Sequence, residues 1–396
     1  MPLSPLIRFG TSTWTYEGWQ GQVYLKQYAK TTFARECLGE YCQYLHNGEP
    51  CFRTVGNDST FYRPPTANQL RHYLNQIPED FEMSFKVWEE ITIPTYARQA
   101  RYGTKAGQPN PRFLDAKLFN DLVLTPYRDA KFEPHTGPFL FEFQRHGMSC
   151  EEFCSRLDTF FGQLPKDFRY AVEIHNAGLL GPDYRKVLEH HGVAHVYNHW
   201  SYMPSLRDQQ QRMEERFTAS FTVLRLLTPL KMSYEAAKKR AEPYTKIVEE
   251  LPAMRRDTVE LAKKAMGEKR KAYVLVNNRS EGNAPLTIQA LRNAFHGAET
   301  RVLAISLCAL SKARIEPLPC RTKRTSRDLN VFCIGRPWST TSMAVSQTIP
   351  RSASTLTRHY RSPMFMVLDL SRSEATVRDG APHTEKAHEC LQGYPS

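Results

Sequence analysis

The stretch KAYVLVNNRSEGNAP (residues 271–285) decides the fold, because it combines an apolar strand, a polar loop and the start of a helix. Residues 273–276 are apolar or aromatic, as in a strand that is buried on both faces, and two asparagines follow directly. A glycine, an acid, a third asparagine and a proline lead into the helical pattern TIQALRNAF (287–295). Strands that end in amide and carboxylate side chains just before a helix are typical of sites in α/β proteins. The stretch therefore predicts a functional site at the end of a buried strand.

The same alternation of strand and helix runs through the first 300 residues. Eight strands alternating with helices over this length predict a (β/α)₈ TIM-barrel-like domain, which we place at residues 1–296. An open doubly wound sheet is the alternative, but no GxGxxG motif follows the first strand. The expected strands are residues 6–12, 51–57, 81–88, 138–144, 169–175, 193–200, 221–227 and 272–278, with helical patterns at 67–77, 113–124, 150–164, 183–191 and 255–267.

The composition changes after about residue 297. Residues 301–396 hold 14 Lys+Arg against 7 Asp+Glu, so they carry +7 of the net charge of +12, and they contain 12 serines. Their short apolar pieces show no sustained period, which predicts a basic tail at 297–396 that is poorly ordered. Such a tail is either a functional arm that could bind nucleic acid or an artefact of the gene model.

Composition also limits the class of protein. The chain has 41% hydrophobic residues but no apolar run of membrane-spanning length, and no signal-peptide pattern opens it. Its nine cysteines form no CxxC pair and have no zinc-finger spacing. We therefore expect a soluble cytoplasmic protein with no membrane partner and no structural zinc. The pattern specifies no oligomeric state.

Five motifs at the predicted strand ends together resemble the YecE-like family, domain of unknown function 72. They are GTSTWTYEGWQGQVY (10–24), STFYRPP (59–65), PEDFEMSFKVWEEIT (78–92), RYAVEIHN (169–176) and VNNRSEGNAP (276–285), in the order and spacing of the family. The resemblance covers about residues 6–295 and implies a TIM-barrel-like fold. It implies no particular reaction.

Three positions depart from the family pattern. In VGNDSTFY (55–62), Gly56 stands where the family commonly has glutamate, and Asp58 stands where it has asparagine. His175 follows the glutamate of the fifth strand at a position where the family usually has arginine. A ligand bound at these positions would meet different charge and protonation behaviour in this chain.

Four residues near the C-terminal ends of the strands are candidates for catalysis. Glu142 and Glu173 lie on strands that are consecutive in the chain, so their carboxylates could approach each other and divide into an acid and a base. His175 shares a strand face with Glu173 and could act as a general base. Lys86 ends the third strand and, like Arg225, either pairs with the glutamates or receives an anionic substrate. The alternative is that each glutamate is merely neutralised by these cations or by a nearby amide.

Aromatic and polar side chains at the strand ends are candidates for ligand binding. Aromatic rings after the first strand could stack on a sugar or a base, or could simply close the top of the barrel. Asp58 could instead belong to a helix cap. The turn at residues 282–283 could cradle a phosphate in front of the last helix. The candidates are Trp14, Tyr16, Asp58, Tyr62, Asn198, Arg225, Asn277, Asn278, Glu281 and Asn283.

Two familiar barrel chemistries are disfavoured. A glycosidase with carboxylates on strands four and seven would need an acid in FTVLRLL (221–227), which contains Arg225 instead; a glycosidase that uses Glu142 and Glu173 as its pair stays open. A metal hydrolase could draw on Glu142, Glu173, His175, His199 and Asp58, but no HxH or HExxH motif supports it. We therefore predict no cofactor, and a divalent metal is the weaker alternative.

The sequence favours an enzyme of unestablished activity that uses acid/base chemistry at the C-terminal face of the barrel. Its substrate is expected to be a polar or anionic small molecule or a nucleic-acid component, because amide and charged groups converge from several strand ends. The competing hypothesis is a non-catalytic module that binds nucleic acid or a metabolite through the same pocket and the basic tail.

Overall fold

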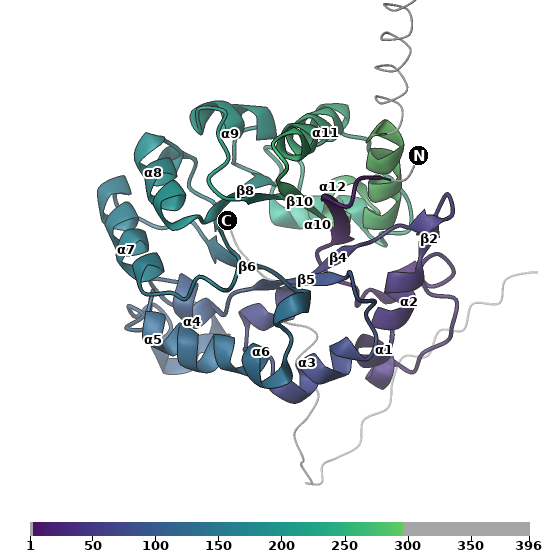
Figure 1. Cartoon of the computed structure of the whole chain (residues 1–396), viewed down its shortest axis with the longest axis horizontal. Helices are drawn as coiled ribbons and strands as arrows, with labels where there is room; N and C mark the ends of the chain where they lie inside the picture. The colour runs from purple at the N-terminus through teal and green to yellow at the C-terminus, as the bar shows by residue number, and fades with distance from the viewer. Residues whose placement is uncertain (1–2, 296–396) are drawn as a thin grey trace, which may run out of the picture. The chain divides into compact units, whose positions relative to one another are not determined.

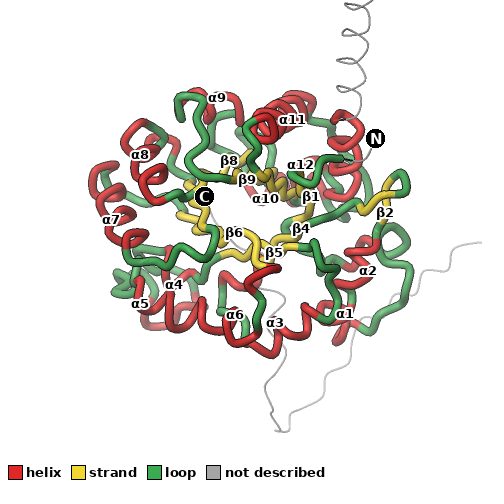
Figure 2. The backbone as a smooth tube through the Cα atoms, viewed as in Figure 1, coloured by secondary structure: helices red, strands yellow, loops and turns green. Residues whose placement is uncertain are grey.

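The computed structural model describes residues 3–295, which form a barrel of parallel strands surrounded by helices (Figure 1). The eight-stranded sheet has the order β1-β10-β9-β8-β7-β6-β5-β4, and Figure 2 shows its strands at the centre with the helices outside. The predicted TIM-barrel-like fold and all eight predicted strands are confirmed. The strands are β1 (Ile7–Thr11), β4 (Thr54–Asn57), β5 (Glu82–Lys86), β6 (Thr136–Phe143), β7 (Tyr170–Ile174), β8 (Ala194–His199), β9 (Phe221–Leu226) and β10 (Lys271–Val276).

The helices agree less closely with the sequence pattern. Those expected at 67–77, 150–164, 183–191 and 255–267 are present, whereas α1, α2, α9 and α10 were not predicted, nor was the hairpin of β2 (Leu45–His46) and β3 (Glu49–Pro50). A helix also begins at residue 284 and continues to residue 295. The α-helices with printed bounds are α1 (Lys30–Glu36), α2 (Leu38–Gln43), α3 (Ala67–Leu74), α4 (Glu89–Thr92), α5 (Ala116–Leu118), α6 (Thr125–Ala130), α7 (Cys150–Gly162), α8 (Pro182–His191), α9 (Leu206–Arg212), α10 (Tyr234–Ala241), α11 (Pro252–Gly267) and α12 (Asn278–Glu281).

The predicted helix at 113–124 ends too early. A π-helical turn at Phe119–Leu124 joins α5 to α6, so helical backbone continues to Ala130. The sequence pattern stopped there because Pro126 normally ends a helix. It lies in the first turn of α6, where its missing N–H costs no essential hydrogen bond.

The alternation of side chains along the strands separates two cores. One buried cluster packs the strands against the surrounding helices, and a second, smaller cluster fills the interior of the barrel with residues such as Val196, Val223 and Leu275. Two residues further along their strands come Asn198 and Arg225, which therefore also face the interior. At the C-terminal mouth of the barrel, a polar layer of side chains thus lies directly above the apolar cluster of the interior.

The opposite end of the interior holds a separate ion cluster around Glu82. Its carboxylate lies 3.5 Å from Arg8 Nε, 3.3 Å from Arg169 Nη2 and 2.8 Å from Lys271 Nζ. Tyr273 donates a further hydrogen bond to it. Three cations face one carboxylate here, so the N-terminal end of the barrel carries an excess of positive charge.

A close approach between β1 and β4 completes the ring of strands. The backbone N–H of Arg53 donates to the carbonyl of Phe9 at 2.9 Å. A Cβ atom on Gly10 would lie only 2.0 Å from the carbonyl oxygen of Thr54, and one on Gly56 would lie 3.0 Å from that of Ser12. Glycine is therefore required at the first position because another backbone occupies the place of its side chain.

The predicted tail at 297–396 lies outside the described residues. No helix within residues 3–295 is long and apolar enough to cross a membrane.

We expect Gly10→Ala to destabilise the protein by about 1–3 kcal/mol, because the added methyl group must force β1 away from β4. Gly178→Ala is the matched control, since a Cβ there meets no atom within 4 Å. Urea unfolding of both variants measures the difference. Equal urea midpoints for Gly10→Ala and wild type would show that the close backbone contact between β1 and β4 can widen without loss of stability.

Candidate functional site

Arg225 lies inside the barrel near the C-terminal end of β9 and joins carboxylates from three other parts of the barrel. Its Nη1 donates to Glu173 and, at 3.1 Å, to Glu142, while Nη2 donates to Asp58 Oδ1 at 3.2 Å. Glu142 and Glu173 are register partners on β6 and β7, and Asp58 begins the turn after β4. Since β9 is hydrogen-bonded to neither β6 nor β4, this one side chain reaches across the mouth of the barrel.

Lys86 extends the network at the end of β5. Its Nζ lies 2.9 Å from Glu142 Oε1 and 4.0 Å from the centre of the Phe61 ring. The Thr60 hydroxyl donates to the backbone carbonyl of Lys86 at 2.6 Å, which ties the strand end to the turn after β4. Both oxygens of Glu142 therefore have a cationic partner.

His175 follows β7 and is held against Glu173. Its Nε2 lies 3.0 Å from Glu173 Oε1, and its ring stacks on Trp200 with centroids 4.2 Å apart and an interplanar angle of 5°. Asn198 Nδ2 donates to the same Oε1 at 3.4 Å and to the Ile174 carbonyl at 3.0 Å. Within residues 3–295, His175 Nδ1 makes no hydrogen bond.

The electrostatics of this cluster keep its carboxylates charged. Burial raises the pKa of Glu173, but Arg225 and His175 outweigh burial and leave that pKa well below its usual value. Burial likewise raises the pKa of Glu142, yet Lys86, His175 and Arg225 leave it lowered. Burial lowers the pKa of Arg225, but Glu173, Asp58 and Glu142 raise it overall.

These directions correct the expected division of the two carboxylates into an acid and a base. Both pKa values are lowered, so neither Glu142 nor Glu173 is held protonated as an acid near neutral pH. Glu173 is also fully buried, with both oxygens hydrogen-bonded to protein groups. Glu173 is therefore fixed between Arg225 on one oxygen and His175 with Asn198 on the other.

The predicted aromatic residues after β1 have partners within the loops. Trp14 is buried, and its Nε1 donates to the carbonyl of Ala34 at 3.2 Å. The Tyr16 hydroxyl donates to the carbonyl of Pro243 at 2.7 Å, and its ring packs against Trp19 and Tyr244. These contacts favour the alternative that the rings close the barrel top.

Tyr62 is the most accessible of the predicted ligand-binding residues in the loop after β4. It is 36% exposed, and the guanidinium of Arg101 lies 5.3 Å from the centre of its ring. Asp58 starts the short helix at Asp58–Phe61 and contributes its carboxylate to Arg225. Asp58 thereby joins the ion network.

The polar residues after β10 bind their own loop and the segments that pack against it. Asn277 Oδ1 accepts from the N–H of Arg279 at 3.0 Å, and Asn278 Oδ1 accepts from that of Ala284 at 2.9 Å. Glu281 is fully buried, accepts from the backbone of Leu251 at 2.6 Å and pairs with Arg255 at 2.8 Å. Asn283 donates to Gln22 and to the carbonyl of Tyr244, both at 2.9 Å. These contacts explain structurally why a polar residue stands at each of these positions. The ligand-binding role of the four residues stays a prediction.

The predicted candidates thus divide into one connected network and two sets in neighbouring loops. The network comprises Asp58, Lys86, Glu142, Glu173, His175, Asn198 and Arg225. The loop after β1 holds Trp14 and Tyr16, the loop after β10 holds Asn277, Asn278, Glu281 and Asn283, and Tyr62 follows the short helix after β4.

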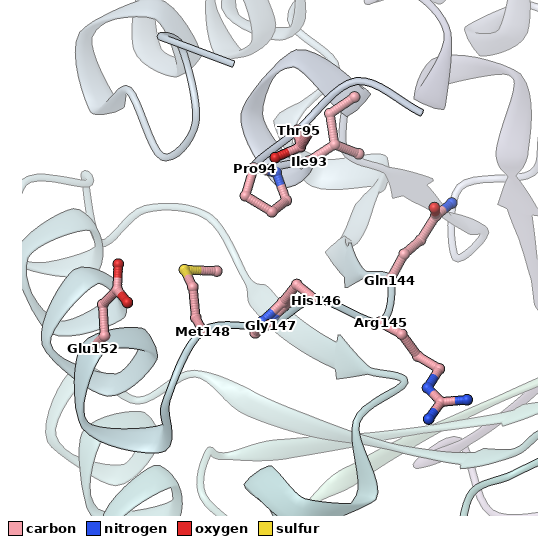
Figure 3. A pocket seen from close by; sticks show the side chains of 9 residues that line it. All are labelled: Ile93, Pro94, Thr95, Gln144, Arg145, His146, Gly147, Met148 and Glu152. Atoms are coloured by element: carbon pink, nitrogen blue, oxygen red, sulfur yellow. The ribbon is translucent and has the colours of Figure 1, made fainter. Parts of the chain in front are cut away.

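A cavity of about 470 Å³ lies beside the network at the same end of the barrel (Figure 3). It is lined by residues 93–95 after α4, residues 144–148 after β6 and Glu152 in the first turn of α7. The segment at 93–95 faces the segment at 144–148 across it. Sequence reasoning missed this cavity, although a polar run directly after a predicted strand was its signal.

The donor atoms of Glu142, Glu173 and His175 lie within 4.8 Å of one another, so this group is the part of the network that could hold a metal ion. Each carboxylate oxygen there already accepts from Lys86, Arg225, His175 or Asn198. A metal ion would have to displace these groups against two permanent cations. The donor set therefore fits ion pairing better than metal coordination. A second group, Asp158, His190 and His191, lies on the outer helices α7 and α8.

The fold and this polar C-terminal mouth define a TIM-barrel-like protein. A family model described as protein of unknown function DUF72 matches residues 8–309, so the chain belongs to this family. The resemblance inferred from the five sequence motifs is thereby confirmed.

Two solved structures illustrate the relationship. A DUF72 family protein from Enterococcus faecalis is 15% identical, with a TM-score of 0.51, over 72% of this chain and 95% of that chain. A DUF72 family protein from Thermotoga maritima is 19% identical, with a TM-score of 0.48, over 73% of this chain and 99% of that chain. At these identities the likeness concerns the fold alone. No curated protein matches the sequence.

Replacing Arg225 by Met should destabilise the protein by about 3–5 kcal/mol near neutral pH, because buried carboxylates would lose their shared cation. The difference in free energy of unfolding between the variant and the wild type should become smaller in acid. Without Arg225 the carboxylates protonate more readily, and their repulsion then disappears. Urea unfolding at neutral and acid pH measures both effects.

The control for this variant is Arg128→Met, which breaks a partly exposed ion pair with Asp167 and should cost no more than about 1 kcal/mol. A deficit for Arg225→Met that is equally large at both pH values would contradict the electrostatic account.

Two buried histidines on the outward face of β8 should make the protein acid-sensitive. Burial lowers the pKa of His195 and that of His199 to about 4, from the usual 6.5. Because each pKa is lower in the folded than in the unfolded protein, acid protonates these histidines in the unfolded chain first. The free energy of unfolding is therefore unaffected above pH 6.5 and declines as the pH falls towards 4, by on the order of 3 kcal/mol per histidine.

His199→Asn tests this linkage, because an amide can still donate to the carbonyl of Thr228 as Nδ1 does at 2.9 Å. Its unfolding free energy should fall less steeply between those pH values than that of the wild type, whereas removal of the exposed histidine in His190→Asn should leave the slope unchanged. Identical slopes in all three proteins would refute the assignment.

Proposed function

We propose that this protein is an enzyme that performs acid/base chemistry on a polar or anionic small molecule, or on a nucleic-acid component, at the C-terminal mouth of its barrel. His175 is the general base, and Glu173 positions it. The observation that carries the proposal is the 3.0 Å contact between His175 Nε2 and the fully buried carboxylate of Glu173.

The contact determines which ring nitrogen is available. A charged carboxylate accepts but cannot donate, so Nε2 carries the proton that lies between the two groups. In the neutral imidazole Nδ1 is then the unprotonated nitrogen, and it can take a proton from a substrate. When Nδ1 is protonated, the negative charge of Glu173 stabilises the imidazolium, as in other histidine–carboxylate pairs.

The remaining residues of the network maintain the charge of Glu173 and the orientation of His175. Arg225 holds the carboxylate of Glu173 charged, and Asn198 donates to the same oxygen as His175. The stacked Trp200 fixes the plane of the imidazole ring. Pre-organised groups of this kind reduce the reorganisation required during reaction.

The alternative is a non-catalytic module that binds nucleic acid or a metabolite through the mouth of the barrel and the basic tail. It predicts binding that weakens with salt and requires residues 297–396, which lie outside the described residues. An enzyme is favoured because a binding site has no need of a histidine oriented by a buried carboxylate.

Turnover of organic phosphates, esters, lactones and sugars by the full chain tests the proposal. His175→Gln should lose about 100-fold or more of any activity found, because it removes the base. Glu173→Gln should also be impaired, since its amide no longer enforces one tautomer. His190→Gln, on the outer helix α8, should retain wild-type turnover.

Nitrogen-15 NMR of the histidine ring provides a readout that needs no substrate. In the neutral form Nε2 of His175 should carry hydrogen and Nδ1 should not. A proton on Nδ1 instead, or full activity in His175→Gln, would remove His175 from the proposed role.

A further inference from the structure

The cavity of about 470 Å³ is lined by the residues that follow β6, and β6 is the neighbour of β7, the strand that carries Glu173 and leads into His175. Glu142 and Glu173 are register partners, as are Phe143 and Ile174, and the N–H of His175 donates to the carbonyl of Phe143 at 3.0 Å. Continuing that register by one residue places Gln144, which lines the cavity, beside His175.

A second connection lies one residue beyond His175 and two residues beyond Gln144. The side chain of Asn176 accepts from the N–H of His146 at 3.1 Å and donates to its carbonyl at 2.9 Å. This pair of hydrogen bonds fixes the cavity-lining loop to the residue that follows the proposed base. The cavity and the catalytic pair therefore belong to one rigid arrangement.

The charge at this end of the cavity is positive. Arg145 is exposed and forms no ion pair within residues 3–295. Its guanidinium lies 5.9 Å from the ring of Tyr202, which in turn packs edge-on against Trp200, the ring that stacks on His175. The contacts with Tyr202 thus hold Arg145 on the same side of the loop as the proposed base. Lys86 differs from Arg145 because it is already paired with a carboxylate, that of Glu142.

The body of the cavity is largely uncharged. Ile93 and Pro94 form one wall and Met148 lies on the other (Figure 3). His146 lies between Gln144 and Met148 along the loop, and neither of its buried ring nitrogens has a hydrogen-bond partner among residues 3–295. Burial lowers the pKa of His146, which favours the neutral form of this ring in the wall of the cavity.

The far end of the cavity differs from the end beside the base. Glu152 lies there, opposite Gln144 and Arg145 in Figure 3, and Arg156 donates to its Oε1 at 3.0 Å. An anionic group is repelled by this carboxylate and attracted by Arg145, so the cavity imposes a direction on an anionic ligand.

Resting on the proposed function, we propose that this cavity is the substrate-binding subsite and that it selects an organic anion with an apolar body. The carboxylate or phosphate group of the ligand pairs with Arg145 next to His175, and the apolar body lies between Pro94 and Met148. The reacting atoms of the substrate then adjoin its anionic group. A volume of this size suits a small organic molecule.

Calorimetric titration of the full chain with four probes tests the subsite. 3-Phenylpropionate and phenyl phosphate carry the anion on an apolar body, 3-phenylpropanamide removes the charge, and inorganic phosphate removes the body. At least one of the two organic anions should bind about tenfold more tightly than the neutral amide and than inorganic phosphate. The preferred organic anion identifies the group as carboxylate or phosphate.

Three variants locate the binding. Arg145→Gln should remove the preference for the charged probe, and Met148→Trp should abolish binding by filling the cavity. Arg128→Gln, on helix α6, is the matched control and should bind as the wild type does. Equal affinity for charged and neutral probes, unchanged binding in Met148→Trp, or no binding at millimolar concentration would each overturn the proposal.

The two sets of experiments distinguish failure of the proposed subsite from failure of the proposed base. Tight binding of an organic anion together with full activity in His175→Gln would leave the subsite standing and remove the proposed base. Loss of activity in His175→Gln without binding of any probe would retain the base and remove the subsite.

Discussion

A single buried guanidinium, that of Arg225, organises the mouth of this barrel. It connects β9 with Glu173 on β7, Glu142 on β6 and Asp58 after β4, so strands that are not neighbours are held at a fixed separation. Burying a cation is costly unless its partners surround it, and three carboxylates meet that requirement. Because Arg225 keeps Glu173 charged, the orientation of His175 depends on the same side chain. Stability of the barrel and readiness of the proposed base therefore share one cause.

The saturation of Arg225 and Lys86 affects how an anion can be recognised. Both cations are already engaged by carboxylates, so neither offers the open fork that an anionic ligand needs. The proposed subsite therefore assigns anion recognition to a side chain outside the cluster, Arg145 on the neighbouring loop. The cluster supplies a fixed electrostatic environment, while contact with the ligand is assigned to the loops. This separation is common in barrels, where strands provide rigidity and βα loops provide variety.

The fold could be predicted from the sequence because strands buried on both faces have a local signature, and the pairing of Glu142 with Glu173 followed from their period on consecutive strands. The reach of Arg225 to Asp58 could not be predicted, since it crosses the barrel and leaves no local pattern. Polar residues after a strand also have two uses that look alike in sequence. Asn278 accepts a backbone N–H group of its own loop and Glu281 one at the start of α11, whereas His175 contacts a carboxylate, and only the path of the backbone distinguishes them.

The position of β1 has a consequence for synthesis of the chain. This first strand is hydrogen-bonded along its whole length to β10, the last strand, and it also meets β4 at the glycine seam. On the ribosome, β1 emerges long before its principal partner exists, so the ring cannot close until nearly all of the barrel has been translated. Contacts of such long sequence separation slow folding and leave an unpaired strand edge exposed meanwhile. The nascent protein is therefore most vulnerable to aggregation in the interval before residue 276 leaves the exit tunnel.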